Sequence, residues 1–259
     1  MKNVLDFYGL KNMPFGKEIA VEDIFSTSQI SNTSAMLKLG LADEDIILLT
    51  GPVGSGKSVT LRTFTDSLDL NKYTPVYLRG NNMNQVELYK FILQEMKIEA
   101  PRSRIKVKTL YFKTVSEATK KPVVIIDDAQ DMSEEALLSI KAMVNFDQDS
   151  TSRICFILAG QPELRETIRF SQFESLRQRI KLNVHLTGMG LEETCAYIDH
   201  SLKVSGRAVS IFSDSAKSEI YNRSEGISRQ VNKVCYQAII NGAINKCDII
   251  DSKDLPFID

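Results

Sequence analysis

Short apolar runs alternate with amphipathic stretches along the first two thirds of the chain. Residues 46–49, 122–126 and 154–159 are continuously apolar, which is typical of strands in a parallel sheet that is covered on both faces. A shorter run of β type spans 75–78. Apolar residues recur at helical spacing over 29–41, 59–68, 85–96 and 134–144, the last with a capping-box-like start at Asp131 and Glu134. Strands that alternate with helices predict a three-layer α/β domain with a parallel sheet.

The pattern changes at both ends of this domain. Residues 5–16 are aromatic and are interrupted by Gly and Pro, which favours an extended or turning arm rather than a helix. From residue 191 onward helical spacing dominates, over 192–204, 213–223 and 228–244, with Ser213 as an N-cap. Thr187-Gly188-Met189-Gly190 is a hinge-like break between the two patterns. We therefore predict an α/β domain over 1–188, whose arm occupies 1–28, and a small helical lid over 189–259.

Composition describes an ordinary globular chain of 259 residues, 43% apolar and 25% charged. A net charge of -1 indicates neither nucleic-acid nor membrane binding by the protein as a whole, so such a surface would have to be a local patch. The four cysteines form no C-x-x-C pair, which favours reduced thiols over a zinc site or a disulfide framework. No apolar run approaches the roughly 18 residues of a membrane helix, and residues 1–6 lack the apolar core of a signal peptide. We expect a cytoplasmic protein without membrane contact.

The segment Gly51-Pro52-Val53-Gly54-Ser55-Gly56-Lys57-Ser58 matches the Walker A pattern and lies between a predicted strand and a predicted helix, as that motif requires. Glycines let the backbone wrap closely around phosphate, and the helix N-terminus adds positive potential. Lys57 is expected to reach the β- and γ-phosphates, and the Ser58 hydroxyl to ligate Mg²⁺. The residues predicted to hold the nucleotide in this loop are Pro52, Val53, Gly54, Ser55, Gly56, Lys57, Ser58 and Val59. A glycine-rich turn that matches by chance is the alternative, but the flanking pattern favours a P-loop that binds ATP with Mg²⁺.

Two acids follow the apolar run 122–126. Asp127 lies where a strand parallel to the P-loop strand delivers a magnesium-organising carboxylate, although such an acid taken alone is a cap or loop residue about half the time. Asp128 stands where enzymes of this architecture usually place Glu to polarise the attacking water. Asp is one methylene shorter, so slow hydrolysis is expected unless a shifted backbone brings the carboxylate to its water.

Further motifs stand in order along the chain. They are Phe7-Tyr8-Gly9-Leu10-x-x-x-Pro14-Phe15, the segment 51–58, Ile125-Ile126-Asp127-Asp128-Ala129-Gln130, Ala159-Gly160-Gln161-Pro162-Glu163-Leu164-Arg165, Gln178-Arg179-Ile180 and Gly226-Ile227-Ser228-Arg229. Together they resemble the ExeA-type AAA+ ATPases over essentially the whole chain. That family includes secretion-pathway ATPases and the ATP-dependent partners of DDE-type transposases. The resemblance implies a P-loop NTPase fold of AAA+ type with a C-terminal helical lid.

The resemblance also implies roles for residues outside the P-loop. Gln161 falls at the sensor-1 position, where a polar side chain senses the γ-phosphate or its water. Arg229 falls at sensor 2, where a lid guanidinium reaches the nucleotide and suits phosphate. An arginine finger for the nucleotide of a neighbouring subunit falls after Gln161, with Arg177 and Arg179 as candidates and Arg165 as the third. For each of these arginines the alternative is an ordinary solvated residue.

The N-terminal arm is implied to line the adenine pocket through Pro14, Phe15 and Ile19, although plain core packing would give the same pattern. The chain departs from the family pattern at two places. The usual Asp-Glu pair reads Asp127-Asp128, which bears on the turnover rate. The sensor-2 Gly-x-Pro-Arg has Ser228 in place of the stiffening proline and keeps Arg229.

The leading hypothesis is an ATPase that oligomerises when ATP is bound, binds double-stranded DNA and recruits a DDE-type transposase to its target. Secretion-type relatives carry a membrane segment and a cell-wall-binding extension after the ATPase, and neither is expected in a chain that stops at Asp259. DNA phosphates would meet a locally basic loop region, whose cations are Arg102, Arg104, Lys106 and Lys108. A solvated basic turn explains these charges equally well.

Three other functions are weighed against this one. The first is a slow or inactive ATPase that works as an assembly switch, in which ATP binding builds the oligomer. The second is a cytosolic ATPase that serves a secretion or cell-envelope system. The third, a small-molecule kinase, is disfavoured by the helical lid with Gly226-x-x-Arg229 and by the lack of an acceptor-binding motif.

Overall fold

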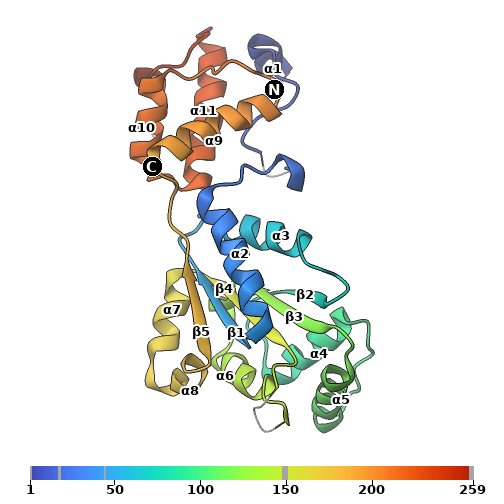
Figure 1. Cartoon of the computed structure of the whole chain (residues 1–259). Coiled ribbons are helices and arrows are strands. Elements are labelled where there is room, and N and C mark those ends of the chain that lie inside the picture. The colour runs from blue at the N-terminus through green and yellow to red at the C-terminus, as the bar shows by residue number, and fades with distance from the viewer. Residues whose placement is uncertain (1, 17–18, 44, 148–150, 257–259) are drawn as a thin grey trace. The chain divides into compact units, whose positions relative to one another are not determined.

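The computed structural model of the chain describes residues 2–16, 19–43, 45–147 and 151–256 (Figure 1). Residue contacts divide the chain into two compact units, and each is described by itself. The α/β unit consists of Ser31–Pro52 and Lys57–Leu186, and the helical unit of Met1–Ile30, Val53–Gly56 and Thr187–Asp259. This division groups the N-terminal segment with the C-terminal helices, whereas the sequence-based boundary groups it with residues up to 188. That boundary stays a prediction.

Within the described residues of the α/β unit, one parallel sheet has the strand order β2-β3-β4-β1-β5. The strands are β1 (Ile46–Thr50), β2 (Tyr73–Arg79), β3 (Lys121–Asp127), β4 (Cys155–Gly160) and β5 (Ile180–His185). The three strands predicted from continuous apolar runs, β1, β3 and β4, are the central ones, and their residues are almost all buried. The edge strand β5 was missed because strands were predicted from continuous apolar runs, whereas its apolar residues alternate with Lys181, Asn183 and His185, as in a half-buried strand.

Helices cover both faces of this sheet. On one face, Ile47 and Leu49 of β1 pack with α2 (Ser28–Asp43) and α3 (Lys57–Asp66). On the other, Ile46 and Leu48 pack with helices from the later part of the unit. These are α4 (Gln85–Glu95), α5 (Arg104–Glu117), α6 (Glu134–Met143), α7 (Pro162–Arg169) and α8 (Glu174–Arg177). Neighbouring strand residues point to opposite faces, so the two cores explain why the central strands are apolar at every position. The predicted three-layer parallel α/β architecture is confirmed.

The start of α6 differs from its prediction. The helix is capped by Ser133, whose hydroxyl accepts the Ala136 N–H at 3.2 Å. Asp131 instead lies in the short 3-10 helix Ala129–Asp131 that follows the strand β3. The capping-box pattern was therefore placed two residues too early, because Ser133 and Asp131 are both good cap residues and only one can be in the cap conformation.

The helical unit is built from α1 (Lys2–Tyr8), α9 (Leu191–Val204), α10 (Asp214–Ser224) and α11 (Ser228–Ile244) around a core of its own. Ser213 is the predicted N-cap of α10, and its hydroxyl accepts the Ala216 N–H at 3.1 Å. The α1 segment was expected to be non-helical. It is a helix because its apolar residues pack on this core, and Gly9, with φ of +65°, ends the helix rather than preventing it. Among the described helices, none is both long and apolar enough to cross a membrane.

Candidate active site

The predicted phosphate-binding loop joins β1 to α3 at the C-terminal edge of the sheet. Gly54 and Gly56 have φ of +85° and +95°, a region that glycine enters at little cost and other residues rarely adopt. Lys57 is the first residue of α3, and its ammonium donates to Gly51 O at 2.7 Å and to Pro52 O at 2.9 Å. The ammonium is thus held against the loop backbone, at the helix N-terminus that phosphate binding uses.

The polar atoms of the loop fit a phosphate group. Ser55 Oγ is buried and has no hydrogen-bond partner among the described residues. Leaving a buried hydroxyl unpaired costs about 1–3 kcal/mol, and a phosphate oxygen bound in the loop would remove that cost. The loop therefore has a conformation and polar atoms that suit phosphate, and the binding of nucleotide by its residues stays a prediction.

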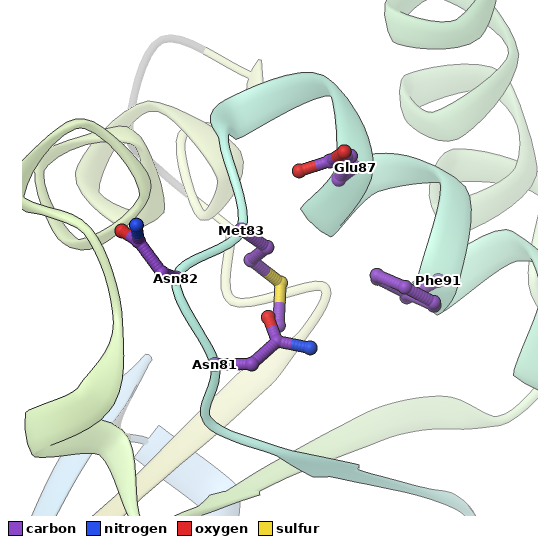
Figure 2. A pocket seen from close by; sticks show the side chains of 5 residues that line it. All are labelled: Asn81, Asn82, Met83, Glu87 and Phe91. Atoms are coloured by element: carbon purple, nitrogen blue, oxygen red, sulfur yellow. The ribbon is translucent and has the colours of Figure 1, made fainter.

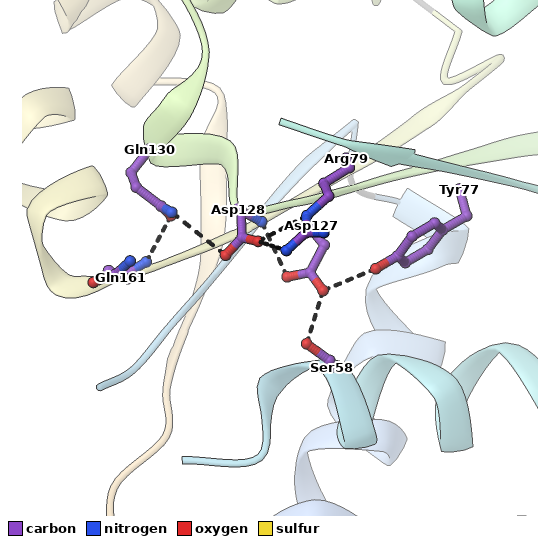
Figure 3. Close-up of polar contacts among 7 residues, drawn as sticks. All are labelled: Ser58, Tyr77, Arg79, Asp127, Asp128, Gln130 and Gln161. Atoms are coloured by element: carbon purple, nitrogen blue, oxygen red, sulfur yellow. Dashed lines mark hydrogen bonds and ion pairs between the residues drawn. The ribbon is translucent and has the colours of Figure 1, made fainter. Parts of the chain in front are cut away.

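Asp127 ends β3, and its carboxylate accepts three hydrogen bonds (Figure 3). Oδ2 accepts from Ser58 Oγ at 2.8 Å and from Tyr77 OH at 2.9 Å, while Oδ1 accepts the Asp128 N–H at 3.0 Å. The Asp127 residue is only 5% exposed. Hydroxyl and carboxylate oxygens are the ligand type that Mg²⁺ prefers, so Ser58 and Asp127 fit the predicted metal site. A bound Mg²⁺ would supply neutralisation of charge on the β- and γ-phosphates.

Asp128 turns away from regular strand geometry, with φ of 55° and ψ of 41°, values that a non-glycine residue adopts rarely. Arg79 donates to its Oδ2 from Nε at 3.3 Å and from Nη2 at 3.2 Å, and Gln130 Nε2 donates to Oδ1 at 3.4 Å. The side chain of Arg79 is 80% exposed and that of Asp128 30%. Ion pairs at such exposed positions are worth at most about 1 kcal/mol, so Arg79 pairs with the Asp128 carboxylate but does not hold it rigidly in place.

Gln130 links Asp128 to the predicted sensor-1 residue. Its Oε1 accepts the backbone N–H of Gln161 at 3.0 Å, while its Nε2 faces Asp128 (Figure 3). Gln161 follows β4 and is the N-cap of α7, whose first residue is Pro162. The observed link uses the backbone of Gln161, and the sensing role of its side chain stays a prediction.

Two residues of this site, Tyr77 and Arg79, were missed by the sequence-based prediction. They alternate along β2 with Val76 and Leu78, which are buried in the core on the opposite face. The strand β2 pairs with β3 in parallel, with Arg79 opposite Asp127. A polar pair in alternation at the C-terminal end of a predicted strand is the sequence signal that could have found them.

The predicted sensor-2 residue lies in the helical unit, which also contains the loop tip Val53–Gly56. The Ser228 hydroxyl donates to Gly54 O at 2.6 Å, and the Arg229 N–H donates to the same oxygen at 3.4 Å. A Cβ at Gly54 would collide with the Cβ of Arg229. Ser228 stands where the ExeA-type pattern has proline, and it makes a hydrogen bond that proline cannot make. The contact of Arg229 with nucleotide stays a prediction.

The arm residues predicted to line the adenine pocket also belong to the helical unit. Phe15 lies edge-on to Tyr197 and Phe212, with ring centroids 6.4 Å and 6.5 Å apart. Pro14 is buried and Ile19 half-buried. These contacts are core packing, so their part in adenine binding stays a prediction.

Of the candidate arginine fingers, Arg165 lies in α7, Arg177 ends α8, and Arg179 directly precedes β5. Arg177 is exposed, and its Nη1 donates to the carbonyl of Arg169 at 2.8 Å. Arg165 and Arg179 are half-buried. A finger acts on the nucleotide of a neighbouring subunit, so a single chain leaves all three as predictions.

The predicted basic loop is largely helical, which corrects its assignment. The helix α5 begins at Arg104, so Lys106 and Lys108 lie within it, and only Arg102 precedes it among the four cations. Val107, Tyr111 and Val115 are buried at a spacing of four residues. That helical spacing was overlooked because the stretch was judged by its charges. All four cations are exposed.

A cavity of about 260 Å³ lies beside the loop that follows β2. It is lined by Asn81, Asn82, Met83, Glu87 and Phe91. Figure 2 shows Asn81 and Met83 pointing from the loop toward the side on which Glu87 and Phe91 of α4 lie. Glu87 is already used there, because it completes a capping box with Asn84. This cavity was not predicted from the sequence.

Comparison with known proteins finds similarity to one domain family and to one curated protein. Residues 41–168 match the AAA domain family. General secretion pathway protein A of Aeromonas hydrophila is 27% identical over 242 residues, which is 90% of this chain and 44% of that protein. The chain therefore spans less than half the length of this curated relative.

Solved structures agree on the fold. The chain resembles Cdc6p from Pyrobaculum aerophilum with a TM-score of 0.68 and 18% identity, over 96% of this chain and 69% of that one. It resembles the RuvB Holliday junction branch migration motor of Thermotoga maritima with a TM-score of 0.56 and 15% identity, over 93% and 70% of the two chains. At these identities the likeness shows the fold, which is of the AAA+ type with a helical C-terminal part.

Proposed function

We propose that this chain is a slow, Mg²⁺-dependent ATPase that works as an assembly switch in a secretion or cell-envelope system. The proposal is supported by the match of residues 41–168 to the AAA domain family and by the distant similarity to general secretion pathway protein A. The observation that carries the proposal is the 2.8 Å hydrogen bond from Ser58 to Asp127. It brings the predicted metal ligand of the P-loop to the carboxylate at the end of β3, as ATP hydrolysis by this class of site needs.

The proposed chemistry divides among four residues of the α/β unit. Lys57 and the loop backbone hold the phosphates, and Ser58 and Asp127 hold the metal. Asp128 accepts a proton from the attacking water or orients it, since it is the partly exposed acid beside the metal carboxylate.

Slow hydrolysis is supported by the surroundings of Asp128. Its carboxylate has a shorter stem than Glu and is shared by Arg79 and Gln130. A general base must be within hydrogen-bond reach of its water, and both features work against that. Slow hydrolysis would give the ATP-bound state a long lifetime, which suits a switch better than a motor.

Assembly is proposed because an arginine finger completes such a site from a neighbouring subunit. Substituting Arg177, Arg179 and Arg165 one at a time by Ala tests the assignment. The finger is the arginine whose loss removes ATP turnover in the assembled state while nucleotide affinity stays at the wild-type value. If all three variants turn over ATP like the wild type, none of them is a finger.

The secretion or cell-envelope setting rests on the name of the relative, of which this chain covers 44%. It is tested by isolating the chain from cells with ATP or ADP present and identifying the proteins that come with it. Recovery of envelope-assembly proteins in the ATP sample alone supports this setting, and recovery of a transposase contradicts it.

The ATPase proposal itself is tested by titrating a fluorescent ATP analogue with and without Mg²⁺, and by measuring phosphate release. Ser58→Ala is expected to lose the Mg²⁺-dependent part of the affinity and most of the turnover. Ser67→Ala is the matched control, since the Ser67 hydroxyl donates only locally to Phe64 O at 2.8 Å. A wild-type chain that binds no ATP at any Mg²⁺ concentration would contradict the proposal.

A second candidate, the ATP-gated DNA-binding partner of a transposase, is favoured by the basic start of α5. Arg104 and Lys106 lie in the first turn of this helix, where the dipole disfavours cations, and no acid lies there to compensate. Together with Arg102 and Lys108 they form an exposed group of four positive charges that suits phosphate backbones.

DNA binding is tested with the double variant Arg102→Glu and Arg104→Glu in duplex-DNA binding at low salt. Loss of binding supports this candidate, and wild-type binding removes it. The control is Lys38→Glu with Lys141→Glu, which changes the net charge equally at exposed positions outside α5.

A further inference from the structure

Tyr77 lies on the edge strand of the sheet and contacts Asp127, the predicted metal ligand. Strand β2 is an edge strand, and its Val76 and Leu78 are buried on the face covered by α4. Tyr77 therefore points to the opposite face, where α3 starts at the phosphate-binding loop. Its hydroxyl donates to Asp127 Oδ2 at 2.9 Å (Figure 3).

The two partners differ in exposure. Tyr77 is 50% exposed, whereas Asp127 is 5% exposed. Burial of the hydroxyl end and its hydrogen bond to the carboxylate both raise the pKa of Tyr77 well above the usual range. The half-exposed ring thus places its hydroxyl as a donor on a buried carboxylate oxygen.

Asp127 Oδ2 accepts a hydrogen bond from Ser58 as well as from Tyr77. Tyr77 matters because the bond from Ser58 must change when the metal binds. The proposed function requires the Ser58 oxygen to ligate the metal, which changes the geometry of its bond to Asp127. Tyr77 and the Asp128 N–H do not take part in that change and hold Oδ2 and Oδ1 respectively. They can keep the carboxylate oriented while Ser58 turns to the metal.

We propose that Tyr77 is a positioning residue, whose hydroxyl holds Asp127 in the orientation that binds Mg²⁺. The inference rests on the proposed function and adds a residue to its metal site. Groups that orient metal ligands typically contribute about 10-fold to 100-fold to metal affinity or activity. An effect of that size is measurable without destroying the fold, because Tyr77→Phe removes one oxygen and keeps the half-exposed ring.

The test compares Tyr77→Phe with Tyr73→Phe, a control on the same strand and the same face, whose ring is partly buried against the core there. Three quantities are measured. They are Mn²⁺ affinity of the ADP-bound chain by electron paramagnetic resonance, affinity for a fluorescent ADP in EDTA, and the Mg²⁺ concentration at half-maximal ATP turnover.

Tyr77→Phe is expected to weaken Mn²⁺ binding about 10-fold or more and to raise the half-maximal Mg²⁺ concentration by the same factor. The affinity for ADP in EDTA is expected to stay at the wild-type value, because no metal is bound there. Tyr73→Phe is expected to match the wild type in all three measurements. This pattern supports a positioning role.

Wild-type Mn²⁺ affinity in Tyr77→Phe would overturn the inference. Equal losses of Mn²⁺ affinity and of ADP affinity in EDTA would also overturn it, since they would show that Tyr77 supports the fold of the site. A wild-type chain that binds ADP but no metal would overturn the proposed Mg²⁺ site itself, so the two failures are distinguishable.

Discussion

The two halves of the candidate site are built differently. The binding half consists of Lys57, Ser58 and Asp127. Lys57 contacts loop carbonyls at 2.7–2.9 Å, and Ser58 contacts the buried carboxylate of Asp127 at 2.8 Å. At the hydrolysis half, the contacts of Asp128 with Arg79 and Gln130 are 3.2–3.4 Å long and partly exposed. Short contacts to buried charged groups are worth more than long, exposed ones. For the function proposed above, these contacts suit holding a nucleotide better than activating water.

The largest expected effect is at the binding half. Lys57→Ala removes the cation that lies against the loop carbonyls, and we expect ATP turnover to fall about 100-fold or more with a matching loss of ATP affinity. Turnover and equilibrium binding of a fluorescent ATP analogue measure both quantities. If turnover fell while ATP affinity stayed unchanged, Lys57 would belong to the hydrolysis half, which would contradict the division of the site into these two halves.

A smaller and opposite effect is expected at Asp128. Asp128→Glu lengthens the stem by one methylene, so the carboxylate extends further toward the attacking water, and we expect turnover to rise about 10-fold. ATP affinity is expected to stay constant, because Asp128 holds neither phosphate nor the metal. Phosphate release under saturating ATP is the measurement. Unchanged turnover would show that stem length does not limit hydrolysis.

The smallest effect is expected for Arg79→Met, which keeps a long side chain and removes the ion pair. Releasing a carboxylate from an interaction of at most about 1 kcal/mol raises its free population, and hence turnover, by up to about fivefold. Because charges in such exposed pairs are screened, the gain is expected to shrink at high salt. A loss of turnover at every salt concentration would instead mean that Arg79 assists hydrolysis.

The predictable parts of the fold are those with a local signal. Strands β1, β3 and β4 are apolar at successive positions because both faces are covered, and the phosphate-binding loop needs its glycines at fixed places. Ser213 caps α10 by accepting the N–H of Ala216, which is only three residues further along the chain. All of these can be found within a short window of sequence.

The parts that were missed depend on distant residues. Tyr77 and Arg79 meet their acids across about 50 positions of sequence, and only the pairing of β2 with β3 brings them together. The helix α1 exists because a C-terminal core receives its apolar face. The alternation along β2 marks Tyr77 and Arg79 as polar, but no local pattern says which acids they meet, so the phosphate-binding loop was placed from the sequence and the partners of the two acids were not.

The central claim, that ATP binding builds an assembly before slow hydrolysis takes it apart, is tested most directly by one experiment. Molar mass is followed by light scattering after ATP is added to the purified chain, while phosphate release is recorded in the same sample. The account predicts that the mass rises before phosphate appears, falls as ADP accumulates, and does not rise when ADP is added alone. A mass that is the same with ATP, with ADP and without nucleotide would contradict it.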